Sequence, residues 1–159
     1  MEPRARKSKK PSAGLPAGRL ETPTFFIDRD TGGRLLALAL RTNGYKVELH
    51  GDHFDQATQD PFWIRGVAQR RWAILTCDRT IARKEPERSL FGTAPTHTFI
   101  LYALSHVQRE RRIPLVLSVL PKLIDLLATV APTGIYRVHT DGRIDAVTGI
   151  KPKFRLEDF

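Results

Sequence analysis

Two aspartates of this sequence follow short apolar runs, a position where a carboxylate can do chemistry. Asp28 follows the run 25–27, and Asp78 follows the run 72–76 with one cysteine between them. Each run is too short for a helix and has the composition of a strand that is buried on both faces. Because open α/β sheets bind their ligands at the carboxyl ends of the strands, we expect both carboxylates at one functional edge.

Carboxylates at neighbouring strand ends repel each other, and an apolar floor beneath them raises the free energy of the doubly ionised state. A shared proton, a paired Arg or Lys, or a divalent cation would compensate, and Mg²⁺ and Mn²⁺ prefer oxygen ligands. Asp60 is a candidate third ligand, because its Asp-Pro pair predicts the start of a helix at the same edge. Capping that helix is its alternative role. Thr76 is a candidate to position a ligand or a water molecule, and Asp30 to support the site or to cap the next helix.

Basic residues flank these acids. They are Arg29, Arg79, Arg83 and Lys84. The chain has 26 Lys and Arg against 17 Asp and Glu, a net charge of +9. Basic side chains beside an acidic pocket are what a phosphodiester backbone needs if it is to approach a metal centre. The sequence contains no G-x-S-x-G, P-loop or G-x-G-x-x-G motif, and the His-rich stretch 50–53 lacks further ligands at zinc spacing.

The periodicity of the chain predicts an α/β protein. We expect strands at 25–27, 45–50, 72–76 and 98–104, helices at 34–43, from 60 to about 70, and at 115–130, and a hairpin from 135–139 and 143–147. Pro121 should kink or split the last helix, and 79–95 should be a loop with at most one helical turn. Alternating strands and helices favour a doubly wound, mostly parallel sheet, with the antiparallel hairpin at an edge.

The composition describes one soluble domain. The 159 residues are 41% hydrophobic and 27% charged, and the only cysteine, Cys77, cannot form an internal disulfide. No stretch predicts a membrane span or a signal peptide, so we expect a cytoplasmic protein. Residues 1–22 hold six basic and two acidic residues, a net charge of +4, and almost no large apolar side chains. We expect a disordered basic tail over 1–22 and a single domain over 23–159.

Several short segments together resemble PIN-like domains of the VapC toxin type. The segments are residues 25–29, 43–47, 52–54, Asp60 with 63–64, and 75–78. The resemblance runs from about Thr24 to Leu104, and 132–147 looks like the terminal hairpin common in that group. It implies an endoribonuclease that depends on Mg²⁺ or Mn²⁺ and is often the toxin of a toxin–antitoxin pair. Its acids, which would hold the metal, map onto Asp28, Asp60 and Asp78.

The chain departs from that pattern in two respects. Similar chains often follow the middle acid with further acids, whereas Pro61 and Phe62 follow Asp60 here, and no residue clearly matches the place of a fourth acid. PIN nucleases commonly use a fourth acid, for which Asp30 and Asp55 are the candidates here. A catalytically silent module that binds RNA or docks an antitoxin is therefore the alternative. A receiver-like signalling domain would want a lysine at the end of a later strand, and 98–105 has none. RNA and a cognate antitoxin are the expected partners, and a homodimer is one of the oligomeric states that the sequence allows.

Overall fold

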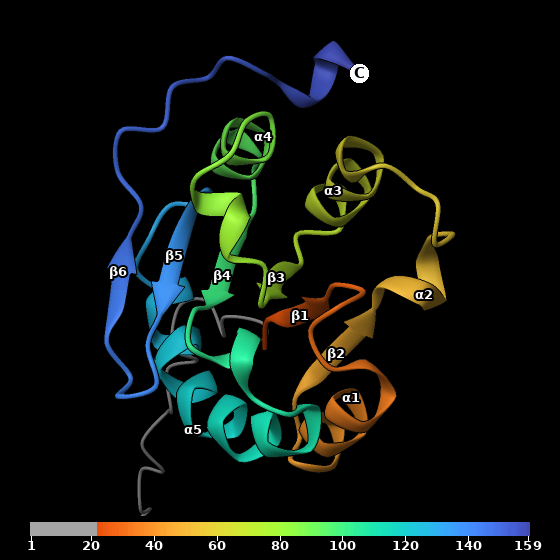
Figure 1. Ribbon diagram of the computed structural model, residues 1–159, viewed down its shortest axis with the longest axis vertical. Helices are drawn as coiled ribbons and strands as arrows, with labels where there is room; N and C mark the ends of the chain where they lie inside the picture. Colours follow the sequence, from red (N-terminus) through yellow and green to blue (C-terminus); the bar gives the residue numbers. More distant parts are fainter. Residues whose placement is uncertain (1–21) are drawn as a thin grey trace, which may run out of the picture.

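A six-stranded sheet forms the centre of the protein in a computed structural model that describes residues 22–159 (Figure 1). The strands are β1 (Thr24–Ile27), β2 (Lys46–Leu49), β3 (Ala73–Thr76), β4 (His97–Leu101), β5 (Gly134–Val138) and β6 (Ile144–Ala146). Their order is β2-β1-β3-β4-β5-β6; all pairs are parallel except β5–β6. The expected α/β fold with an antiparallel pair at the C-terminal edge is confirmed. The expected tail, except for its last residue, lies outside the described residues.

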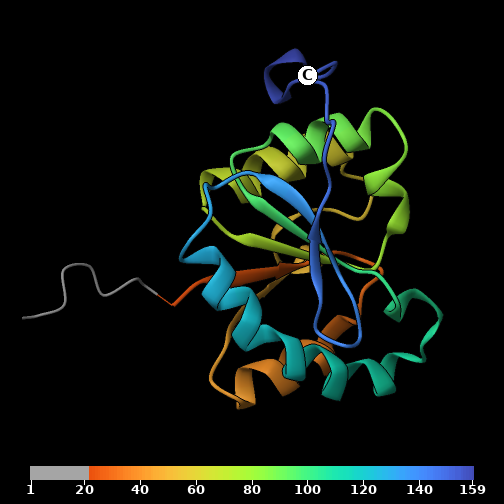
Figure 2. The same ribbon diagram turned by 90° about the vertical axis from the view of Figure 1, so that its left-hand side faces the viewer.

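Helices cover both faces of this sheet. α1 (Gly33–Thr42) and α5 (Arg109–Leu127) pack on one face, and α3 (Asp60–Gln69) and α4 (Glu87–Thr93) pack on the other (Figures 1 and 2). Short helical turns complete the connections. They are α2 (His50–His53), η1 (Arg79–Ala82), η2 (Leu104–His106) and η3 (Leu156–Asp158). Every helix between residues 22 and 159 is too short or too polar to span a bilayer.

β1 shows why this sequence forms a strand with two buried faces. Phe25 and Ile27 join the core beneath α1 and α5, whereas Phe26 joins the core beneath α3 and α4. All three side chains are completely buried. Since side chains alternate along a strand, a run of large apolar residues satisfies both cores at once. The next residue, Asp28, is the first that reaches the carboxyl edge of the sheet.

The strand order brings the two predicted carboxylates to neighbouring strands. β1 pairs in parallel with β3, with Ile27 opposite Leu75, so Asp28 and Asp78 follow adjacent strand ends. The chain leaves β1 toward β2 on one side of it and returns to β3 on the other side. This reversal is the topological switch point, where open α/β sheets form a crevice for ligands.

Two helical regions differ from the prediction. α5 begins at Arg109 rather than at 115 and runs through both Pro114 and Pro121 as one helix. A split at Pro121 is therefore wrong, whereas the bend of this helix in Figure 2 leaves the alternative of a kink standing. Burial of its apolar side chains, such as Leu120 and Leu123, compensates for the hydrogen bonds that the prolines remove.

The segment 79–95 is not a loop with one turn, because it forms η1 and α4. The cause is burial of Leu90 and Phe91 beneath the C-terminal segment, in a region where the sequence shows little periodicity. That segment crosses α4 toward α3 (Figure 1). It is held by Ser89, whose hydroxyl donates to the carbonyl of Lys151 at 2.5 Å, and by Arg65, which donates to the Phe159 carbonyl at 2.7 Å.

Candidate active site

Asp28 is the centre of the polar site at the carboxyl edge of β1 and β3. The Thr31 hydroxyl donates to its Oδ1, and the Thr76 hydroxyl donates to its Oδ2. Each hydroxyl also accepts a backbone N–H, Thr31 from Cys77 at 3.0 Å and Thr76 from Asp78 at 3.1 Å. Both threonines are completely buried. Their hydroxyls are therefore fixed in direction, and they hold the Asp28 carboxylate in one orientation.

Burial raises the pKa of Asp28 from 3.8 to about 6. The hydrogen bonds from Thr31 and Thr76 oppose this shift, while the charges of Asp30 and Asp78 add to it. Within residues 22–159, no Arg or Lys is among the groups that shift this pKa. A half-buried carboxylate near two like charges is in the situation that a bound cation relieves.

Asp78 lies next to Asp28 at the end of β3 and has an exposed side chain. Its Oδ1 accepts from the Thr80 N–H at 2.9 Å and from the Thr80 hydroxyl at 2.7 Å, which caps η1. Among the described residues, its second oxygen has no hydrogen-bond partner. Asp28 and Asp78 thus offer carboxylate oxygens at one edge, a donor set that fits a hard cation such as Mg²⁺ or Mn²⁺.

Asp60 has other partners. It is the first residue of α3, and its Oδ1 accepts the indole N–H of Trp63 at 2.8 Å and lies 3.5 Å from Nη2 of Arg29. The residue before it, Gln59, occupies the cap position, so the expected capping role is wrong. In the part of the chain that the structure describes, no group of three or more His, Cys, Asp or Glu residues is placed to hold a metal ion. A shared site of Asp28, Asp60 and Asp78 stays a prediction.

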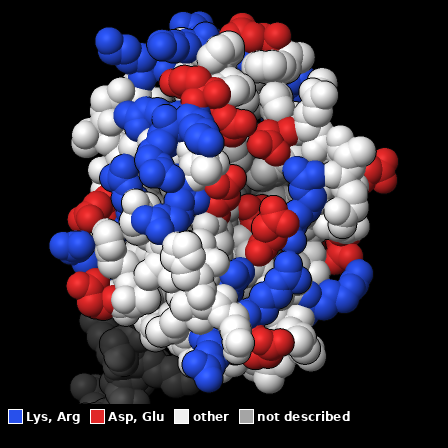
Figure 3. All heavy atoms as spheres, viewed as in Figure 1, with Lys and Arg blue, Asp and Glu red and all other residues white. Residues whose placement is uncertain are grey.

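The predicted RNA-binding residues have different surroundings. Arg29 donates to the Gln56 carbonyl and pairs with Asp60, so its charge is partly used within the protein. Arg79, the first residue of η1, has its guanidinium carbon 4.0 Å from the centre of the Tyr102 ring. Arg83 and Lys84 are exposed. Figure 3 shows a dense group of basic side chains over η1, α4 and β5, beside several acidic side chains.

Arg112 was not found by sequence reasoning. It is only 8% exposed, and it reaches from the first turn of α5 to the loop that follows β1. It donates to the carbonyls of Thr31 at 2.7 Å, Asp30 at 3.2 Å and Val107 at 2.9 Å. The sequence did contain one hint. A cation in the first turn of a helix lies near the positive end of the helix dipole, which is unfavourable unless local contacts compensate for it. Arg112 fixes the loop that carries Thr31, and through Thr31 it helps to position Asp28.

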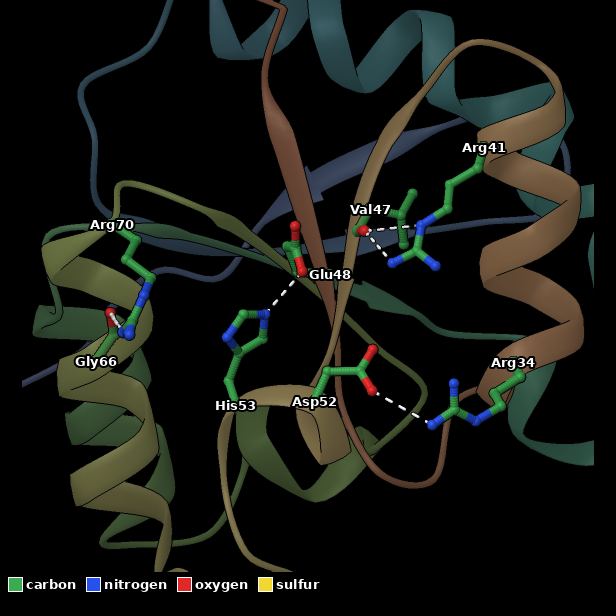
Figure 4. Close-up of polar contacts among 8 residues, drawn as sticks. All are labelled: Arg34, Arg41, Val47, Glu48, Asp52, His53, Gly66 and Arg70. Carbon is green, nitrogen blue, oxygen red and sulfur yellow. Dashed lines mark hydrogen bonds and ion pairs between the residues drawn. The ribbon is translucent and has the colours of Figure 1, made fainter.

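The residues of the His-rich stretch face different partners. Nε2 of His53 lies 2.7 Å from Oε2 of Glu48, and Asp52 lies 3.3 Å from Nη2 of Arg34 (Figure 4). His50 is 1% exposed, and burial lowers its pKa. This stretch directly follows the carboxyl end of β2, next to the candidate active site.

The fold and the site define a doubly wound α/β protein whose carboxylates lie at the switch point of the sheet. A family model described as a PIN like domain matches residues 23–103, slightly more than half of the chain. The chain therefore belongs to the PIN-like domain family. The match contains β1 to β4 and all three predicted acids, whereas α5, β5 and β6 lie beyond it. No curated protein and no solved structure matches the chain.

Proposed function

We propose that this protein is a metal-dependent endoribonuclease that hydrolyses RNA phosphodiester bonds. The observation that carries the proposal is the half-buried Asp28 carboxylate, held by two threonine hydroxyls beside Asp78 at the switch point. Membership of the PIN-like family supports it, because such domains are often nucleases. The basic side chains beside these acids support an anionic polymer as substrate.

Residues of this chain would supply the carboxylates that hold the metal ion and the hydroxyls that orient them. Asp28 and Asp78 would hold Mg²⁺ or Mn²⁺, with Asp60 as the proposed third ligand. When bound, the ion would activate water and stabilise negative charge on the phosphate oxygens. Thr31 and Thr76 keep Asp28 in place.

Arg79, Arg83 and Lys84 would attract the RNA backbone to this edge. Because the pKa of Asp28 is about 6 without a cation, protons compete with the metal for this carboxylate at acidic pH.

Cleavage assays on the full chain test this proposal. We expect a short single-stranded RNA to be cut with Mg²⁺ or Mn²⁺ and to stay intact with EDTA. Asp28→Asn and Asp78→Asn should each abolish cleavage, whereas Asp125→Asn, which changes an exposed carboxylate on α5, should cleave normally. Unchanged cleavage by both site variants would contradict the proposed roles.

A catalytically silent RNA-binding module is the second candidate. It is favoured by the pairing of Asp60 with Arg29, which engages a proposed metal ligand within the protein. Salt-dependent RNA binding without metal-dependent cleavage would select this function.

The assignment as the toxin of a toxin–antitoxin pair rests on the sequence resemblance alone. It predicts that expression stops cell growth, that Asp28→Asn removes this effect, and that a small protein encoded beside it neutralises the toxin. Growth unaffected by the wild-type protein would contradict the toxin assignment without touching the nuclease proposal.

A further inference from the structure

An aromatic ring with two arginines beside it lies at the carboxyl edge, one strand beyond Asp78. Tyr102 is the first residue after β4, and its backbone N–H donates to the Val138 carbonyl at 3.0 Å. The guanidinium carbon of Arg79 lies 4.0 Å from the ring centre and that of Arg137 lies 6.0 Å from it. We call Tyr102, Arg79 and Arg137 the Tyr102 cluster. It joins η1, β4 and β5, and Tyr102 is half-buried.

The arginines of this cluster are not paired with carboxylates in the part of the chain that the structure describes. Across residues 22–159, neither Arg79, Arg83 nor Arg137 forms an ion pair with a carboxylate. The nearby Arg143, by contrast, lies 3.8 Å from Asp145. Hydrogen bonding from Arg79, and then the charges of Arg79, Arg83 and Arg137, lower the pKa of Tyr102. Arginines that gather around one ring and form no ion pair with a carboxylate favour a polyanionic ligand.

The position of the cluster relates it to the site at Asp28. β4 is the neighbour of β3, which is the neighbour of β1. Adjacent strands lie about 4.8 Å apart, so Tyr102 is about 5 Å beyond Asp78 and about 10 Å beyond Asp28 across the edge. One strand of nucleic acid lying along this edge can contact both places.

We propose that the Tyr102 cluster is a binding site for a nucleotide of single-stranded RNA adjacent to the phosphate at Asp28 and Asp78. The base stacks on Tyr102 and the guanidinium planes, and the arginines contact its phosphate. Aromatic rings and arginine planes are the usual platforms for unpaired bases, which a duplex does not expose. The location of the cut phosphate rests on the proposed function, whereas binding itself does not.

Equilibrium binding of a fluorescein-labelled single-stranded RNA to the full chain in EDTA tests this inference. Tyr102→Phe should bind as the wild type does. Tyr102→Leu should bind about 5- to 160-fold more weakly, the effect of losing one stacked base. With an abasic version of the probe, the wild type and Tyr102→Leu should bind equally. Arg137→Gln should weaken binding and reduce the salt slope of log K by about 0.7.

Matched controls lie at the opposite edge of the sheet. Tyr45→Leu and Lys46→Gln change a tyrosine and a basic residue at the amino end of β2, and both variants should bind the probe as the wild type does. Circular dichroism melting of each variant confirms that the fold is intact.

The outcomes separate this inference from the proposed function. Binding that depends on Tyr102 in a protein that cleaves nothing would support the cluster and contradict the nuclease. Cleavage by the wild type, together with unchanged RNA binding by Tyr102→Leu and Arg137→Gln, would overturn the cluster and leave the nuclease standing. That second result would also be expected if the cluster docked an acidic protein instead of RNA.

Discussion

Replacing Asp28 by Asn should stabilise the metal-free protein at neutral pH while it abolishes activity. The folded-state pKa of about 6 lies above the unfolded value of 3.8. As pH rises, the unfolded chain therefore releases this proton first, and the wild type loses stability between about pH 4 and pH 6. A difference of about 2 pKa units corresponds to about 3 kcal/mol once both states are ionised.

The amide variant removes this penalty but introduces a smaller one. Asn has one acceptor oxygen, whereas Asp28 accepts hydroxyl hydrogen bonds from Thr31 and Thr76 at two oxygens. One mismatched hydrogen bond costs about 1 kcal/mol. The variant should therefore match the wild type near pH 4.5 and exceed its stability by about 2 kcal/mol near pH 7.5.

Urea denaturation in EDTA at these two pH values measures the difference. Asp125→Asn is the control, since an exposed substitution should change stability by less than about 0.5 kcal/mol at either pH. A stability difference between Asp28→Asn and the wild type that is the same at both pH values would refute the reasoning. A destabilised variant at pH 7.5 would refute it as well.

Three further variants test the parts of the site separately. Thr76→Val removes a hydrogen bond that lowers the pKa of Asp28, so the acid limb of the pH–cleavage profile should move to higher pH, while Thr76→Ser should keep the wild-type profile. Arg112→Met leaves the carbonyls of the loop after β1 without their donor. This change should lower the free energy of unfolding by about 2 kcal/mol and the melting temperature by about 4–8 °C. An unchanged melting temperature would refute this anchoring role. Asp60→Asn should change stability by less than about 1 kcal/mol, because its pair with Arg29 is partly exposed, and should reduce cleavage in Mg²⁺; full cleavage would remove Asp60 from the proposed ligands.

The sequence was sufficient to predict the sheet and the position of two acids. The run 25–27 must be buried on both faces, and this requirement identifies a central strand and places Asp28 directly after it. The same logic applies to β3 and Asp78. The alternation of strands and helices then leaves few topologies, and the observed order brings both strand ends together.

Long-range polar contacts were beyond sequence reasoning. Arg112 lies more than eighty residues from Thr31 in the chain, and only the packing of α5 on the sheet brings them into contact. The Tyr102 cluster was predicted only in part for the same reason. Arg79 follows Asp78 in the sequence and was identified. Tyr102 joins it through the pairing of β3 with β4, and Arg137 through the pairing of β4 with β5.

The local sequence was a poor guide to the structure at two places, α4 and Asp60. α4 was missed because only a few of its side chains, such as Leu90 and Phe91, are apolar, and the C-terminal segment supplies the rest of their burial. The pairing of Asp60 with Arg29 and Trp63 could not be seen either, since Asp-Pro at a helix start has the same appearance whether the carboxylate caps, pairs or binds a metal.

Crystals soaked in Mn²⁺ test the central claim most directly, because anomalous scattering locates the ion without reference to activity. The account predicts one anomalous peak at coordination distance, about 2.1 Å, from carboxylate oxygens of both Asp28 and Asp78, and no such peak in Asp28→Asn crystals. A wild-type protein that shows no peak at this edge, or binds Mn²⁺ only elsewhere, would contradict it.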